Sequence, residues 1–288
     1  MNTLWQEIKI KMLHSGSRLG LLIGLNIIVY LAINIPAVFE WAFTGHNLIS
    51  TYADDYLSLP AYLPKLATRF WTPFTYMLMH ASILHIFFNM LWLYWMGQIF
   101  EEYLGNKRTI GLYILGGLSG ALFFVLAYNF IPAFAGGAIG VTVVGASASV
   151  MAIMIATATL LPDYAISLMF IGPVKLKWIA IVYLILDFLL IAGPNGGGEI
   201  AHLGGALFGF IYIKQLQRGN DWIGGIIKIF KSKPKLKVVA KNADKNTNSL
   251  PRQEEIDRIL DKISRSGYDA LSKQEKEVLF RASKDNEG

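Results

Sequence analysis

The five residues Gly145–Ser149 read Gly-Ala-Ser-Ala-Ser and lie inside a long apolar stretch. No Lys, Arg, Asp or Glu occurs between Thr109 and Pro162. Taken alone, such a run of small residues is typical of a surface on which membrane helices pack closely. It also sets Ser147 among small neighbours, which leave room for a polypeptide backbone beside the hydroxyl. A helix-packing surface and a nucleophile are therefore the two hypotheses for this stretch.

The composition around this stretch is that of a membrane protein. The 288 residues are 54% hydrophobic and only 16% charged, whereas a soluble domain carries about 25% charged residues. Long apolar stretches with few charges indicate a chain that crosses a bilayer several times. The sequence contains no cysteine, which excludes disulfides, thiol catalysis and cysteine-ligated metals.

Six apolar segments predict an all-α, polytopic membrane fold with six transmembrane helices. The first has no small-residue cleavage site and is interpreted as a retained helix rather than a signal peptide. The segments lie within a predicted membrane domain, 19–218, which follows a short N-terminal segment, 1–18. They are Leu19–Phe39, Ser82–Phe100, Thr109–Ile131, Val141–Leu161, Trp178–Ala192 and Ile200–Leu216.

The distribution of basic residues predicts the orientation of these helices. Lys and Arg occur in the N-terminal segment, in the turn 101–108, in the loop 163–177 and in the tail, but not in the turns 132–140 and 194–199. Short cytoplasmic loops carry the excess of Lys and Arg. Six helices with both termini in the cytoplasm satisfy this pattern.

The tail is predicted to have two parts. Residues 219–250 are rich in lysine and are interpreted as a flexible basic linker near anionic lipid; no nucleic-acid motif accompanies the charge. In residues 251–288, Ile256, Ile259, Leu260 and Ile263 share one helical face. After Gly267, Ser272 and Glu275 fit a capping box.

Residues 251–288 therefore predict a small cytoplasmic helical hairpin. A unit of this size buries little core by itself, so we expect it to dock on a partner whose identity the sequence does not indicate.

Four polar side chains are predicted to lie at the same depth. With both termini inside, the second, fourth and sixth helices all begin at the outer face. His85 and Asn89 lie in the first turns of the second helix, and His202 lies just after the turn before the sixth. Ser147 lies roughly 10 Å beyond the Gly-rich break if the fourth helix begins at Val141. We therefore expect these four side chains to meet in the outer half of the bilayer.

This convergence predicts a nucleophile and its base. An ionisable side chain inside a membrane is costly to bury unpaired, so His202 is a candidate general base for Ser147; the alternative is an interface histidine bonded to a loop carbonyl. Gly205 and Gly209, four residues apart, would let the sixth helix approach a neighbour closely.

His85 and Asn89 share one helix face and are candidate donors to an oxyanion. The alternative is a metal site that includes His80, His85 and His202. No HExxH spacing or nearby carboxylate pair supports zinc, so neither a metal nor another cofactor is expected. His80 is interpreted as a residue that orders the loop by hydrogen bonding.

Asp187 is the acidic residue within a predicted span. It fits either a third member of a catalytic triad, orienting His202, or a hydrogen bond to a neighbouring helix, and the second interpretation is favoured.

These motifs resemble those of the rhomboid intramembrane serine proteases. His80-Ala-Ser-Ile-Leu-His85-Ile-Phe-Phe-Asn89 is similar to the family's HxxxxHxxxN motif, and Gly145-Ala-Ser147 to its nucleophile motif. Ala201-His202-Leu-Gly-Gly205-Ala-Leu-Phe-Gly209 is similar to its sixth-helix motif. The resemblance covers about residues 17–218.

The resemblance implies a six-helix fold, a Ser147–His202 dyad, and an oxyanion hole made by His85, Asn89 and the Ser147 N–H. It implies transmembrane protein substrates cut near the outer face, and a multi-pass protein of a bacterial inner membrane. Because the family uses a dyad, the resemblance also argues against Asp187 as the third member of a triad.

Three positions depart from the common pattern. Ala148 follows the nucleophile in place of glycine, and Met151 occupies a position that is often aromatic. The first loop lacks an adjacent Trp-Arg pair: Thr72 follows Trp71, and Arg69 is only nearby.

Two further function classes remain open at this stage. A catalytically inactive rhomboid-like protein could bind or escort client helices, although the intact Ser147 and His202 argue against it. A transporter is the weaker alternative, because the polar groups cluster at one side of the membrane and do not follow a path across it.

Overall fold

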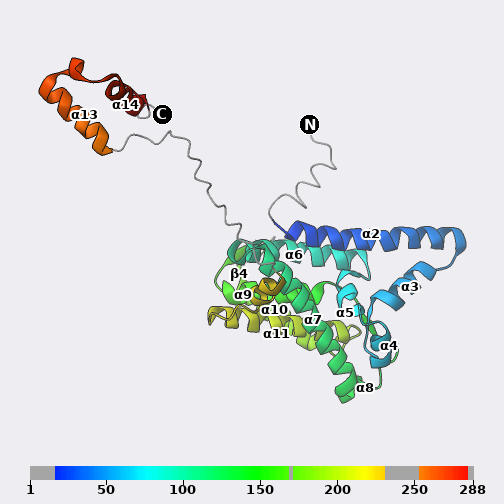
Figure 1. Cartoon of the computed structure of the whole chain (residues 1–288). Coiled ribbons are helices and arrows are strands. Elements are labelled where there is room, and N and C mark those ends of the chain that lie inside the picture. Colours follow the sequence, from blue (N-terminus) through cyan, green and yellow to red (C-terminus); the bar gives the residue numbers. More distant parts are fainter. Residues whose placement is uncertain (1–16, 169–170, 231–252, 285–288) are drawn as a thin grey trace. The chain divides into compact units, whose positions relative to one another are not determined.

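The computed structural model describes residues 17–168, 171–230 and 253–284. The chain divides between residues 232 and 233 into two compact units. The first contains a helical bundle and the second a helical hairpin (Figure 1). The all-α fold predicted from composition and hydropathy is confirmed.

The first unit combines long helices with short helices and two-stranded ribbons. In chain order these are α2 Leu19–Thr44, α3 Leu48–Leu57, β1 Leu59–Pro60, α4 Leu63–Thr68, α5 Thr72–Thr75, η2 Tyr76–Leu78, α6 Ile83–Leu104, α7 Asn106–Phe130, α8 Pro132–Ala135, β2 Thr142–Val143, α9 Ser147–Leu160, β3 Ala165–Leu168, β4 Gly172–Lys175, α10 Leu176–Leu190, α11 Gly196–Gln217 and α12 Trp222–Phe230.

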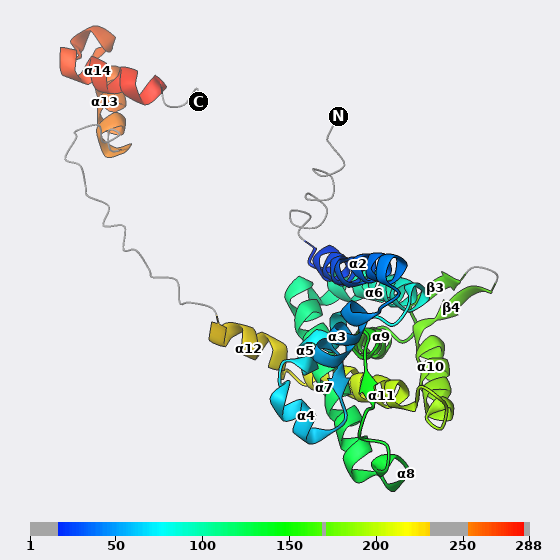
Figure 2. The same ribbon diagram turned by 90° about the vertical axis from the view of Figure 1, so that its right-hand side faces the viewer.

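The six predicted transmembrane segments correspond to α2, α6, α7, α9, α10 and α11. Among the described helices, α2, α6 and α7 are long and apolar enough to cross a membrane by length and composition, and α9 is a shorter apolar helix. Helix α9 lies at the centre of the bundle (Figure 2). All its residues from Ala148 to Ala158 are buried, chiefly against α11, α7 and α6.

The start of α9 differs from the prediction. We expected a helix from Val141, but the helix begins at Ser147. Thr142 and Val143 instead form a strand that pairs antiparallel with Leu59–Pro60. Gly145, with a φ of 130°, then turns the chain into the helix.

Other helix boundaries also differ. Helix α2 continues past Pro36 and ends at Thr44. Gly45 caps it in a left-handed conformation, and the Gly45 N–H bonds the Trp41 carbonyl. The charged turn expected at residues 101–108 is reduced to Gly105, because α6 ends at Leu104 and α7 begins at Asn106.

The segment 40–79, which lies between the first two predicted membrane helices, contains three short helices, a 3-10 turn and a strand. Arg69 forms an ion pair with Asp55 of α3. The Trp71 indole donates to the Tyr56 carbonyl at 2.8 Å. Although Trp71 and Arg69 are not adjacent in sequence, both therefore anchor the same region of this segment.

The last helices of the first unit begin earlier than expected. Helix α11 starts within the Gly-rich turn, so Glu199 lies in its first turn and not before it. The predicted basic linker, 219–250, begins with a helix, α12, and the expectation of a segment without helix is wrong there. Asp221 accepts from the Arg108 guanidinium at 2.7 Å, which ties the start of α12 to α7. The rest of the linker lies outside the described residues.

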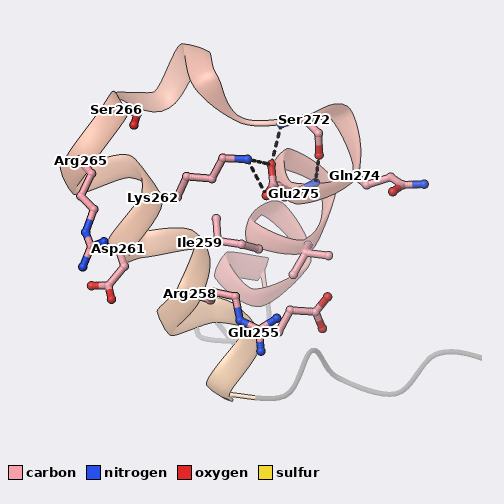
Figure 3. A pocket seen from close by; sticks show the side chains of 11 residues that line it. Glu255, Arg258, Ile259, Asp261, Lys262, Arg265, Ser266, Ser272, Gln274 and Glu275 are labelled. Carbon is pink, nitrogen blue, oxygen red and sulfur yellow. Dashed lines mark hydrogen bonds and ion pairs between the residues drawn. The ribbon is translucent and has the colours of Figure 1, made fainter.

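The second unit is a hairpin of α13 Gln253–Ser266, the turn η3 Tyr268–Ala270 and α14 Lys273–Lys284. Ile259 and Leu271 are buried in it. The predicted capping box is confirmed: the Ser272 N–H donates to the Glu275 carboxylate at 2.7 Å, and the Glu275 N–H donates to the Ser272 hydroxyl at 3.3 Å. Lys262 from α13 also binds this carboxylate, which closes the hairpin (Figure 3).

The Glu275 carboxylate should titrate at unusually low pH. The bond from Lys262 and the Ser272 N–H lower the pKa of Glu275 from 4.5 to about 2. A depressed pKa means that this cap contributes stability above pH ~4.5 and loses it as pH falls through about 2. We expect the Ser272 amide NMR resonance of the full chain to titrate with a midpoint near 2. Lys262→Ala should move that midpoint upward, and Glu275→Gln should remove the transition; a wild-type midpoint near 4.5 would contradict the cap geometry.

Candidate active site

A cavity of about 410 Å³ opens where the N-terminal ends of α6, α9 and α11 meet α10. It brings together all four side chains that the sequence analysis singled out for chemistry: Ser147, His202, His85 and Asn89. The remaining lining residues are Leu84, Phe88, Trp92, Val144, Val150, Met151, Met154, Tyr183, Asp187, Asn195 and Gly198.

Ser147 is the first residue of α9 and is partly accessible from the cavity. The first backbone bond of this helix runs from the Val150 N–H to the Ala146 carbonyl at 2.9 Å. The N–H groups of the preceding residues therefore have no partner within the helix. A helix N-terminus with free N–H groups favours negative charge nearby, so the Ser147 hydroxyl lies beside a ready anion-binding position.

Gly145 allows His85 to approach this serine. The Gly145 N–H donates to the Tyr76 carbonyl at 2.9 Å, which fixes the turn. A Cβ at Gly145 would lie 2.9 Å from the Nε2 atom of His85 and 3.3 Å from the Ser147 Oγ. The positive φ and the close approach together require glycine at this position.

The hydrogen bonds of His85 and Asn89 leave donors free for the cavity. His85 Nδ1 accepts from the Ala81 N–H at 3.4 Å, so the ring hydrogen belongs on Nε2, the atom that faces Gly145. The Asn89 amide uses one N–H to bond the His85 carbonyl at 2.9 Å. Its second N–H is available to a ligand in the cavity.

His202 lies in the second turn of α11 and contacts two carboxylates. Its Nδ1 lies 3.2 Å from Asp187 Oδ1 and 3.4 Å from Glu199 Oε2. The Asn195 amide holds the other oxygen of Glu199 at 3.1 Å. Because ionised carboxylates only accept hydrogen bonds, Nδ1 carries a ring hydrogen, and in the neutral imidazole Nε2 then keeps its lone pair.

The favoured interpretation of Asp187, a bond to a neighbouring helix, was incomplete because the group it contacts is His202 itself. Glu199 was assigned to a turn and was missed as a partner of His202. Its position three residues before His202 would have indicated the contact, had α11 been predicted to begin at Gly196.

The small residues at the start of α9 pack closely against the neighbouring helices. A Cβ at Gly205 would lie 2.0 Å from the Ala148 carbonyl oxygen, and one at Gly209 would lie 2.2 Å from that of Ala152. On the α7 side, a Cβ at Gly120 would lie 2.5 Å from the Ala148 Cβ. The segment therefore provides both a helix-packing surface and an accessible hydroxyl, because Ala148 faces the neighbouring helices while Ser147 faces the cavity.

His80 is buried and lies outside the cavity lining. Its ring packs edge-on against that of His85, with centroids 5.2 Å apart. Within the described residues, neither ring nitrogen makes a hydrogen bond of standard geometry. The interaction seen for His80 is therefore ring packing on His85, and a role in ordering the loop stays a prediction.

One group in this region has the donor atoms of a cation site. Asp187, Glu199 and His202 present two carboxylates and one imidazole whose ligand atoms lie within 4.8 Å of one another. The three histidines considered in the sequence analysis do not form such a group among the described residues. The same contacts also suffice to orient the imidazole.

Comparison with family models gives two matches. Residues 67–218 match the model described as the Rhomboid domain, which spans more than half of the chain and includes every residue that lines the cavity. Residues 242–285 match a family of unknown function (DUF6576). This second match contains the described hairpin.

Proposed function

The chain belongs to the rhomboid family of integral membrane proteins, and from that premise we propose that it is an intramembrane serine endopeptidase. Ser147 is the nucleophile and His202 its general base. The observation that carries the proposal is the shared cavity, in which Ser147 begins a helix beside the donors of His85 and opposite a histidine whose Nδ1 is already engaged.

The chemistry follows from the positions of the protons. His202 Nε2 takes the hydroxyl proton as Ser147 Oγ attacks the carbonyl carbon of the scissile bond. The resulting oxyanion accepts hydrogen bonds from His85 Nε2–H, the free Asn89 N–H and the Ser147 backbone N–H. His202 then returns the proton to the leaving amine, which leaves an acyl-serine. Water, deprotonated by the same imidazole, hydrolyses this ester and regenerates Ser147.

The length of α9 supports cleavage within the membrane. A helix of 14 residues is roughly 21 Å long, shorter than a hydrocarbon core of about 30 Å. If its C-terminus reaches one surface, Ser147 lies below the other. The bias of Lys and Arg makes the cytoplasmic side the one that α9 reaches, so substrates are transmembrane proteins cut near the outer end of a span.

The direct test uses the purified protein in liposomes with a labelled single-span substrate, together with a fluorophosphonate probe that acylates activated serines. The proposed enzyme cleaves the substrate, and the probe labels it at Ser147. An inactive binder would retain the substrate helix without cleavage and without labelling, and that result would reject the proposal.

A substitution at Gly145 tests the position of the oxyanion. Gly145→Ala should lower kcat on the order of 100-fold, because a Cβ there lies 2.9 Å from His85 Nε2 and displaces that donor. Gly140→Ala is the matched control: Gly140 also has a positive φ, 86°, but its Cβ would meet nothing within 4 Å. The control carries the backbone strain without the clash and should keep most of the activity. Equal losses in the two variants would assign the effect to strain alone.

A further inference from the structure

The acidic group behind His202 has no role in a mechanism that uses only a dyad. Asp187 is 5% exposed although it lies on α10, a helix whose other described faces are largely apolar and exposed. Burial of a carboxylate in such a place is costly unless it is paired. Its Oδ1 contacts His202 Nδ1, and its Oδ2 makes no hydrogen bond within the described residues. The contact with the imidazole is thus a favourable polar interaction for this side chain, with the Glu199 carboxylate as a second polar neighbour.

We propose that Asp187 is a positioning residue, which holds His202 in the Nδ1–H tautomer with Nε2 directed at Ser147, and that Glu199 assists it. This inference rests on the proposed protease function, which it deepens. It replaces the dyad implied by family resemblance with an arrangement in which carboxylates orient the base.

The two carboxylates restrain the imidazole from different elements. Glu199 lies on the same helix as His202, three residues earlier, and is itself held by Asn195. Asp187 reaches the ring from α10. Contacts from two directions fix the ring plane, and a carboxylate beside Nδ1 stabilises the imidazolium that forms when Nε2 takes the serine proton. Because the surroundings are apolar, this stabilisation is screened less than it would be in water.

Asp187, Glu199 and His202 could instead bind a cation. The two alternatives, a cation at Nδ1 or a proton on Nδ1, differ in what they allow at Nε2. A metal on Nδ1 requires that nitrogen to be unprotonated, so the ring hydrogen would lie on Nε2. Nε2 could then not accept the Ser147 proton. A bound cation would therefore block the proposed reaction, whereas the Nδ1–H tautomer supports it.

The key variant is Asp187→Asn, which keeps the size of the side chain and removes its charge. An amide can donate to Nδ1 and so stabilise the wrong tautomer. We expect kcat to fall between about 100- and 10,000-fold with KM nearly unchanged. Glu199→Gln should reduce kcat less, because the Asp187 contact is the shorter. Asp163→Asn, at an exposed ion pair with two lysines, is the control and should keep the wild-type rate.

The tautomer is read directly from the ¹⁵N resonances of His202, in the Ser147→Ala protein so that catalysis is not needed. We expect Nδ1–H with Asp187 present and Nε2–H in Asp187→Asn. An Nε2–H signal with Asp187 present, a kcat within twofold of wild type in Asp187→Asn, or activation of the wild type by a chelator would each overturn the positioning role. Failure of the wild type to cleave would overturn the protease function instead, and the tautomer measurement would still decide the role of Asp187.

Discussion

Ser147→Ala is expected to abolish cleavage of a reconstituted transmembrane substrate, with kcat reduced by about 10⁴-fold or more. The variant lacks the oxygen assigned to the acyl intermediate in the proposed mechanism, and nothing else in the cavity lining is a serine, threonine or cysteine. Folding should be unaffected, because the Ser147 hydroxyl faces the cavity while the buried face of α9 is unchanged. Cleavage and fluorophosphonate labelling should disappear together.

The matched control is Ser149→Ala, two residues further along the same helix. The Ser149 hydroxyl is fully buried against α7 and makes no hydrogen bond within the described residues. Its removal should leave kcat within a few-fold of wild type. The double variant Ser147→Ala with His202→Ala should be no worse than either single variant, because the proposed mechanism needs both side chains for the same step. Cleavage that survives in Ser147→Ala would reject the assignment of the nucleophile.

The bundle could be predicted from the sequence because lipid imposes a simple rule: a spanning segment must be apolar, and its backbone must bond internally. The start of α9 could not. Residues 141–144 are mostly apolar, as in a membrane-spanning helix, and hydropathy does not distinguish a short buried strand from a helical turn. What decides the conformation is the pairing of Thr142–Val143 with Leu59–Pro60, which lies far away in the sequence. The predicted depth of Ser147 therefore rested on six residues of helix, 141–146, that precede α9 and include the strand Thr142–Val143.

The group around His202 was missed for a related reason. Three consecutive glycines, Gly196–Gly198, favour a turn because glycine is a poor helix former. In the structure they begin α11, and a Cβ at Gly196 would lie 2.0 Å from the Ile191 carbonyl oxygen. The glycines serve close packing at the helix start, and this places Glu199 one turn before His202. The next glycine packs against α7, where a Cβ at Gly197 would lie 2.8 Å from the Phe124 ring. Such a contact between distant parts of the chain cannot be deduced from local propensity.

Gly205→Ala is expected to lower both activity and stability, because it changes the distance between α11, which carries His202, and α9, which carries Ser147. An added Cβ would lie 2.0 Å from the Ala148 carbonyl oxygen and 2.8 Å from its carbon. These are backbone atoms of α9 and cannot turn aside as a flexible side chain can. Helix α11 must therefore move away from α9 by about 1 Å, which is of the size that costs about 100-fold in rate when reacting groups are displaced. His202 moves with α11, while Ser147 stays with α9.

Overpacking of this kind also costs about 1–3 kcal/mol of stability or more, so the melting temperature in detergent should fall together with kcat. Gly225→Ala is the control, because Gly225 lies in helix α12 with nothing within 4 Å of an added Cβ. There the alanine should be neutral or stabilise the helix by up to about 1 kcal/mol. Lipid offers no hydrophobic force to press two helices together, so close backbone approach supplies much of the attraction. Wild-type activity and melting temperature in Gly205→Ala would mean that this contact does not set the Ser147–His202 spacing.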